Sequence, residues 1–190
     1  MKTKLLILTA ALSFTFAGSA MALTQGEYKA GMTKASADYK AGQTSCAALK
    51  ANAKDICMSE AKGMERVAKA ELEAQYKPST KNTEKVALAK GNATYDTAKE
   101  KCDDLAGNAK DVCVKDAKAA HVKAKEDAKV AQVTSATSQN KNTKVMDAKK
   151  DATVEKNEAS YKAAVERCDA LSGGSKDSCV SAAKTQFGMK

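Results

Sequence analysis

Six cysteines occur as three pairs, and each pair has ten residues between its members: Cys46 with Cys57, Cys102 with Cys113, and Cys168 with Cys179. Thiols at a fixed spacing could bind a metal ion, carry out redox chemistry or form structural disulfide bonds. Zinc sites use closer pairs such as C-x2-C, and redox disulfides and haem attachment use C-x-x-C motifs. None of these motifs occurs in this sequence. The spacing therefore favours three structural disulfide bonds over a metal site or a redox centre.

The remaining side chains give little sign of catalysis. His121 is the only histidine, and the other two cysteine repeats have Glu65 and Phe187 at its position, so we expect it at the surface or at the boundary of the core. The adjacent carboxylates Asp103 and Asp104 would point to different sides of a helix, and no glycine-rich phosphate loop is present. We therefore predict no catalytic residue, no metal ligand and no cofactor, and we expect a protein that is not an enzyme.

The cysteine pairs belong to a longer repeat with the consensus A-x-Y-x6-C-x2-L-x4-K-D-x-C-x3-A-K. The three copies are separated by periods of 56 and 66 residues. Fixed internal spacing over this length is typical of a tandem array of one structural unit. We therefore expect the three copies to adopt the same local structure.

Small and apolar residues follow a helical spacing on both sides of each cysteine pair. Upstream of the first pair they form one stripe: Tyr28, Met32, Ala35, Tyr39, Gly42, Cys46 and Leu49. Downstream they form a seam of mostly small residues: Cys57, Ala61, Met64, Ala68 and Leu72, with the counterparts Cys113, Ala117, Ala120, Ala124, Ala128 and Ala131. Such steps of three and four place tyrosine, cysteine and leucine on one helix face. Two helices that meet at small residues can approach closely.

A turn is expected between the two cysteines of each pair. Gly107 and Gly173 predict a left-handed residue that ends the first helix. Asn108, followed three residues later by Asp111, resembles a capping box for the second helix, and Asn52 with Asp55 repeats this pattern in the first copy. The first copy departs from the glycine pattern of the turn, because Ala51 stands where the other copies have glycine.

A continuous helix is the alternative to the turn. Eleven residues make three helical turns, so both cysteines could lie on one face of an unbroken helix, bridged to another chain. On that helix the cysteines would be roughly 16 Å apart, whereas a disulfide needs Cα atoms within about 7 Å. A bridge within the chain therefore requires a reversal. We predict an all-α fold of three antiparallel helical hairpins, each clipped by one disulfide worth roughly 3 kcal/mol in the chain-entropy model.

The hairpins are assigned to residues 23–77, 78–136 and 137–190. Pro78 separates the first two, with Ser79 or Thr80 as the expected N-cap of the following helix. The polar run at residues 134–143 is either a loop or a weak stretch of one long helix. Large aliphatic residues are scarce, so the disulfides are expected to replace much of a conventional core.

Residues 1–22 have the pattern of a cleavable secretion signal. Lys2 and Lys4 precede the apolar stretch LLILTAALSFTFAG, and Ala20-Met21-Ala22 matches a small-x-small cleavage site. Secretion into an oxidising compartment suits disulfide formation, and we predict the bacterial periplasm. No later stretch is apolar enough to span a membrane.

The charges suggest two kinds of surface. Without the two lysines of residues 1–22 the net charge falls from +9 to +7. Acidic residues are interspersed among the remaining lysines, and this mixture favours solvated helix faces and argues against nucleic acid as a ligand. Lys62, Lys118 and Lys184 occupy one repeat position and would form a basic row if the hairpins align. Tyr39, Tyr95 and Tyr161, each seven residues before a cysteine, are expected in the core.

The alanine- and lysine-rich composition and the repeated C-x10-C hairpins resemble small periplasmic proteins of Gram-negative bacteria that are sometimes labelled TolA-like. AKEDAK and DAKKDATVEK also resemble, weakly, the 11-residue helical repeats of desiccation-protective proteins. Neither resemblance implies an activity or site residues. We expect a structural or stress-protective role at the cell envelope. The alternative is a module that binds an anionic envelope polymer or another periplasmic protein through basic helix faces.

Overall fold

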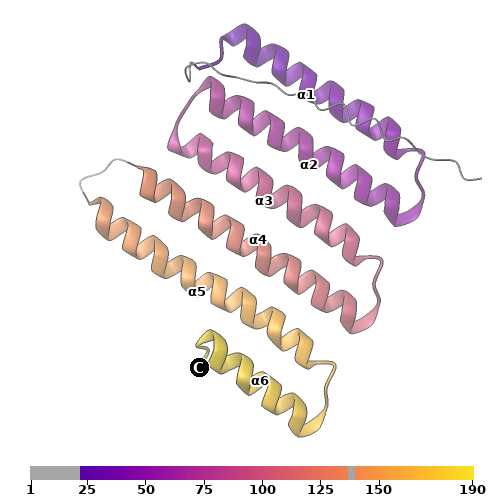
Figure 1. The fold of residues 1–190 in the computed structure, drawn as a ribbon, viewed down its shortest axis with the longest axis vertical. Coiled ribbons are helices and arrows are strands. Elements are labelled where there is room, and N and C mark those ends of the chain that lie inside the picture. The colour runs from indigo at the N-terminus through magenta and orange to yellow at the C-terminus, as the bar shows by residue number, and fades with distance from the viewer. Residues whose placement is uncertain (1–21, 137–139) are drawn as a thin grey trace, which may run out of the picture.

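The computed structural model describes residues 22–136 and 140–190, which form six α-helices and no strand. They are α1 (Gln25–Cys46), α2 (Ala51–Tyr76), α3 (Thr80–Cys102), α4 (Gly107–Ser135), α5 (Lys141–Cys168) and α6 (Gly173–Phe187). Figure 1 shows them running back and forth across the layer, side by side in chain order from α1 at the top to α6 at the bottom. Within the described residues each helix packs only on its neighbours in the sequence, so the fold is a single layer with two exposed faces. The predicted secretion signal lies outside the described residues, apart from Ala22.

Each hairpin is closed by the disulfide that the spacing predicts. The Cα atoms of the bridged cysteines are 5.5, 5.6 and 5.7 Å apart in hairpins one to three. The first cysteine of each pair is the last residue of α1, α3 or α5, and its side chain is almost completely buried. The predicted all-α fold of three clipped hairpins is confirmed, and all six cysteines are bridged within the chain.

The buried part of the layer consists almost entirely of small residues: Ala35, Cys46, Ala61, Gly63, Asn82, Gly91, Cys102, Ala128, Ala148, Ala152, Ala163, Cys168 and Ala183. From α1 to α4 neighbouring helices approach closely because one of each pair has glycine at the contact. A β-carbon at position 42 would lie 3.0 Å from the β-carbon of Ala61, and one at position 91 would lie 3.1 Å from that of Ala124. At these two contacts there is no room for a large aliphatic side chain between the helices.

The repeat leucines do not lie on the inward stripe, which corrects one prediction. The preceding helix ends at the cysteine, and each leucine belongs to the turn that follows, where its amide donates to the carbonyl of that cysteine. Leu49, Leu105 and Leu171 are 43, 44 and 45% exposed, respectively. Helical spacing failed here because it cannot detect where the helix stops. Met64, predicted in the alanine seam, is also exposed.

The turn glycines have the predicted left-handed backbone but a different role. Gly107 and Gly173 both have φ +55°, and they begin the second helix instead of ending the first. Ala51 adopts the same conformation with φ 47°, so the first turn has the same shape despite its different residue. The predicted capping boxes are wrong. The N-caps of α2, α4 and α6 are Lys50, Ala106 and Ser172, and none makes a side-chain capping bond.

The turn asparagines instead connect one hairpin to the next. The side-chain amide of Asn52 donates to the backbone carbonyl of Glu100 at 2.7 Å, and that of Asn108 donates to the carbonyl of Glu166 at 2.9 Å. Both acceptors lie two residues before the end of a first helix, α3 or α5. Each of these carbonyls also accepts a bond from the amide that follows its helix, Asp103 at 3.1 Å or Asp169 at 3.2 Å, so the asparagine adds a second bond at the helix end. The last hairpin has Gly174 at this position.

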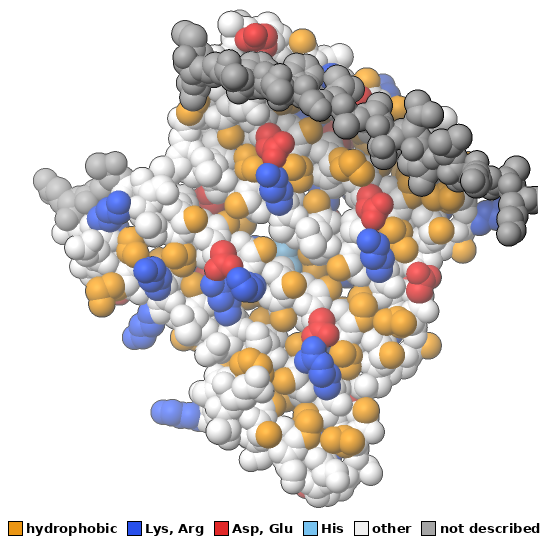
Figure 2. All heavy atoms as spheres, in the orientation of Figure 1, with side chains coloured by type: hydrophobic (Ala, Val, Ile, Leu, Met, Phe, Trp, Pro, Cys, Tyr) orange, Lys and Arg blue, Asp and Glu red, His pale blue; other side chains and the backbone are white. Residues whose placement is uncertain are grey.

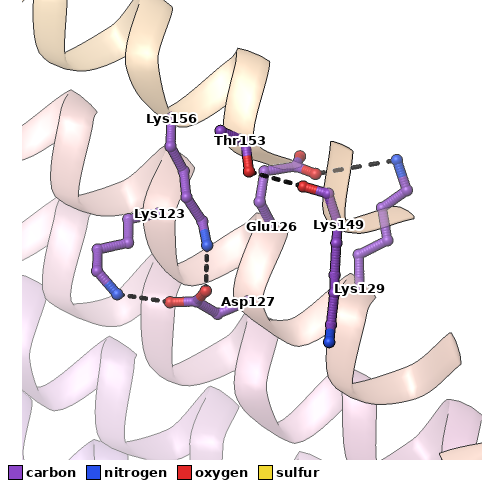
Figure 3. Close-up of polar contacts among 7 residues, drawn as sticks. All are labelled: Lys123, Glu126, Asp127, Lys129, Lys149, Thr153 and Lys156. Atoms are coloured by element: carbon purple, nitrogen blue, oxygen red, sulfur yellow. Dashed lines mark hydrogen bonds and ion pairs between the residues drawn. The ribbon is translucent and has the colours of Figure 1, made fainter. Parts of the chain in front are cut away.

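Two ion pairs repeat at the same junctions. Glu60 with Lys101 joins α2 to α3, and Asp116 with Arg167 joins α4 to α5 at the equivalent position. The second pair is Glu71 with Lys90, and its equivalent is Asp127 with Lys156, which Figure 3 shows together with Lys123 on the same carboxylate. The hairpins therefore join through one repeated interface into a continuous layer.

The segments between hairpins are short. α2 ends at Tyr76, and Ser79, one of the two predicted N-caps, caps α3 by accepting a hydrogen bond from the amide of Asn82 at 3.1 Å. α4 ends at Ser135 and α5 begins at Lys141, so residues 134–143 do not continue one long helix. Residues 137–139 of this segment lie outside the described residues.

The left-handed turn residues give a direct test of the repeat turn. A51G should stabilise the oxidised protein by about 0.5–1 kcal/mol, because glycine removes the steric cost of a positive φ. G107A should destabilise it by about 1 kcal/mol for the converse reason. The measurement is chemical denaturation without reductant. G174A is the matched control. Gly174 follows the turn glycine of the third hairpin, has a negative φ and has open space around it, so this substitution should be neutral or slightly stabilising. An A51G protein less stable than the parent would contradict the turn geometry.

Candidate interaction surfaces

A groove runs between α2 and α3 on the face shown in Figure 2. Its volume is about 600 Å³, and the lining is mostly small or apolar: Gly63, Met64, Val67, Ala68, Ala93, Thr94, Thr97 and Ala98. Its floor is set by the close approach of the two helices, because a β-carbon at position 63 would lie 2.8 Å from that of Ala93. Met64, which is 67% exposed, stands at its side.

The charged residues at the rim of this groove form ion pairs with one another. The repeated ion pairs of the hairpin junction also line the groove, with Glu60 and Lys101 3.2 Å apart and Glu71 and Lys90 2.7 Å apart. Figure 2 shows such acid and base pairs recurring across this face, with hydrophobic side chains between them. The face therefore carries little local net charge and offers mainly apolar contact.

A second groove of about 530 Å³ lies between α3 and α4. It is lined by the alanine seam that the sequence predicts, including Ala117, Ala120, Ala124, Ala128 and Ala131. Lys90, Thr94 and Ala98 of α3 line both grooves, so the two grooves open on the same face. Spacing alone placed the alanines on one helix face, but it could not show that part of this face remains open.

His121 lies at the wall of the second groove, as a partly buried boundary residue. Its ring stacks on Tyr95 with 4.5 Å between ring centres, and its Nε2 is 2.6 Å from the amide oxygen of Asn92. Because an amide oxygen only accepts, Nε2 donates this bond. Burial lowers the pKa of His121, and the charge of Lys125 lowers it further, while Asp96 acts in the opposite direction. The imidazole is held in place by these contacts.

The repeat tyrosines are partly buried, which corrects the prediction that they belong to the core. Tyr95 lines the second groove, and Tyr39 lines a polar hollow between α2 and α3 and accepts a bond from Gln43. A stacked pair that the spacing did not reveal, Tyr28 on Tyr76 with ring centres 4.6 Å apart, joins the start of α1 to the end of α2. Residues so far apart in sequence give no local signal of this contact.

The opposite face is charged. One hollow between α2 and α3 is lined by Lys62, Arg66, Asp96 and Lys99, and its counterpart between α4 and α5 by Lys115, Lys118, Glu155, Glu158 and Lys162. Lys62, Lys118 and Lys184 lie five residues after the second cysteine of their repeats, on the alternate helices α2, α4 and α6. All three are exposed, and in the described part of the chain none forms an ion pair. We call these three residues the lysine row.

Two further findings concern the described residues. No group of three or more His, Cys, Asp and Glu side chains there is arranged to hold a metal ion. In the same ranges, no helix combines the length and the apolar character that a bilayer crossing requires.

Comparison with known proteins gives no relative from which to transfer a role. No family model matches the chain, and no significant match was found among the curated proteins or the solved structures. A proposal for function must therefore be based on the geometry of the layer and its two faces.

The contacts of His121 predict a pH dependence of stability. Its pKa in the folded protein lies below 6.5, the ordinary value expected for the unfolded chain. As the pH falls through 6.5 the unfolded chain binds the proton first, so stability present above that pH is lost towards the lower folded pKa. Denaturation midpoints of the parent should fall between pH 7.5 and 5.5, and H121Q should lose part of that decrease.

The carboxylates provide the control for this measurement. The pKa values of Asp127 and Glu65 are lowered, mainly by hydrogen bonds from Lys123 and from Lys69 respectively, so their contributions are lost only below their ordinary values of 3.8 and 4.5. Equal slopes for the parent and H121Q between pH 7.5 and 5.5 would show that the histidine contacts do not influence folding.

Proposed function

We propose that this protein is a non-enzymatic structural or stress-protective protein of the bacterial periplasm. The three disulfides indicate an oxidising compartment outside the cytoplasm. The single observation that carries the proposal is a layer in which every hairpin has its own covalent fastener and both faces are exposed. The compositional resemblance to secreted alanine- and lysine-rich proteins favours the same setting.

The architecture supports this role through the way its stability is distributed. A domain with one large core is lost when that core is disrupted, whereas a repeat array has stability that is approximately a sum over units and their interfaces. In this layer each unit is closed by a bridge that heat or acid does not break. The exposed apolar grooves between α2, α3 and α4 offer contact to unfolding proteins, and the interspersed charges keep the layer soluble.

A protective role can be tested by light scattering from a heat-labile reporter enzyme. The oxidised protein, in modest molar excess, should reduce the scattering of the heated enzyme at least two-fold. M64E, which places a charge at the first groove, should protect less, because it disrupts apolar contact without touching a helix interface. An exposed lysine on the opposite face provides the matched control, and K62E should protect as well as the parent.

Two outcomes would contradict this proposal. In the first, the oxidised protein leaves the scattering unchanged at every ratio tested. In the second, it protects equally well after reduction and alkylation, which would show that the clipped layer is not needed.

Binding of an anionic envelope polymer is the second candidate function. The lysine row favours it, because three exposed and unpaired cations repeat on alternate helices of one face. Helices that pack side by side are about 8–10 Å apart, so alternate helices place the lysines about 16–20 Å from one another. A long polymer could contact all three at once. Such binding would be electrostatic and would weaken as salt screens the charges.

A salt titration distinguishes this candidate from the first. The affinity for lipopolysaccharide or peptidoglycan should fall at least ten-fold between 20 and 300 mM salt. Over this range the Debye length shortens from about 20 Å to about 6 Å, so that the attraction of exposed charges is screened. The variant K62Q/K118Q/K184Q should bind more weakly, while K34Q/K123Q/K162Q, which removes three lysines already paired within their own helices, should bind like the parent. No binding at low salt would exclude this function.

A further inference from the structure

The C-terminal hairpin leaves half of one helix without a partner. In hairpins one and two the contacting residues lie at equal distances on the two sides of the disulfide: four residues for Gly42 with Ala61, eleven for Gly91 with Ala124, and fifteen for Gly31 with Leu72. α6 ends eight residues after Cys179, where Gly188 takes the left-handed conformation with φ 66°. By the same register α6 covers α5 only to about Ser160. In the described chain, residues 141–159 of α5 have no neighbour on that side.

Figure 1 shows the result as an open corner beside α5, below its N-terminal half. The side of α5 that faces this corner presents the repeat positions that α2 and α4 cover in the other hairpins: Met146, Lys150, Thr153, Val154 and Asn157. Val154 corresponds to Met32 of α1 and Leu88 of α3, both partly buried, yet it is 54% exposed. Met146, two turns further along the same side, is 71% exposed. This strip of α5 continues the interface between α5 and α6.

We propose that the strip is covered by α6 of a second copy of this chain, in a two-fold symmetric dimer. A two-fold axis perpendicular to the layer would bring the two C-terminal edges together, with each α6 in the open corner of the other copy. The lengths agree: α6 has 15 residues, about 22 Å, and the open part of α5 spans about 28 Å at the rise of an α-helix. The two layers then join into one, and the interface closes on itself.

The free edge of α6 suits such a contact. It has small, uncharged residues, all exposed: Gly174, Ser178, Ser181, Ala182 and Thr185. Gly174 and Ala182 among them stand at the positions that carry the hairpin ties in α2 and α4. Small residues allow the strip of α5 to approach closely, and this edge of α6 brings no charged side chain into the contact. The large side chains of the contact come from the strip itself, in Met146 and Val154.

The same edge argues against a filament of copies joined head to tail. Such a filament would place α6 of one copy against α1 of the next, in the manner of α2 against α3. The repeated ties are missing from both surfaces: Gly174 and Ala182 replace the asparagine and the acid, and Ser45 of α1 replaces the base. A closed dimer needs none of these ties.

The experiment is analytical ultracentrifugation of the oxidised full-length mature chain, with three proteins compared from about 1 μM to 1 mM. The parent should dimerise, with twice the monomer mass at high concentration. M146E/V154E should raise the dissociation constant at least ten-fold while its circular dichroism stays that of the parent, since both side chains are exposed in the monomer. M64E, an equally exposed methionine on α2, is the matched control and should dimerise normally.

Amine cross-linking of a mixture of ¹⁴N- and ¹⁵N-labelled copies then locates the interface. Links between copies should join Lys184 to Lys149 or Lys150, which the two-fold arrangement brings to the same level. A parent that stays monomeric up to about 1 mM overturns the proposal. It is overturned equally by a dimer that M146E/V154E leaves intact, or by links between copies that fall on the face of Figure 2.

Discussion

The close approach of neighbouring helices at small residues is the constraint on which the rest of the structure depends. Glycine and alanine at the contacts bring α1 to α2 and α3 to α4 so near that a β-carbon at Gly42 or Gly91 would be crowded. This spacing puts the cysteine Cα atoms within 5.7 Å of each other, as a disulfide requires. It also removes the large side chains that normally stabilise a fold, since burial of each contributes about 1.5–3 kcal/mol. The small residues therefore have two effects: they bring the cysteines close enough to form the disulfide, and they leave too little buried apolar area for the hairpin to be stable without it.

Repetition extends one hairpin into a layer. The junction between hairpins uses an asparagine on a helix-terminal carbonyl and two ion pairs, at equivalent positions in both junctions. Most of these charged groups are exposed, so each ion pair contributes about 0–1 kcal/mol and serves mainly to fix the register. Hydrogen bonds to the ends of α3 and α5 add about 1 kcal/mol each. The result is two different faces, one with apolar grooves and paired charges, and one with the lysine row.

Local patterns predicted much of this fold, and they failed where a contact joins distant residues. The cysteine spacing and the helical stripes were sufficient for the hairpins, the bridges and the N-cap at Ser79. They misplaced the repeat leucines, because a stripe of apolar residues does not show that the helix ends at the cysteine. Asn52 and Asn108 were interpreted as local caps, since their partners lie in the next hairpin, far along the sequence. The open side of α5 followed only from comparing where α6 stops with the lengths of α2 and α4.

The dependence of each hairpin on its own bridge is the central claim of this account. Hydrogen exchange of the oxidised variant C102S/C113S, compared with the parent, tests it most directly. The account predicts that α3 and α4 lose protection by about two orders of magnitude, corresponding to roughly 3 kcal/mol, while α1 and α6 keep most of theirs. Unchanged protection in α3 and α4 would show that packing alone holds the hairpin, and would contradict the claim that disulfides replace the missing core.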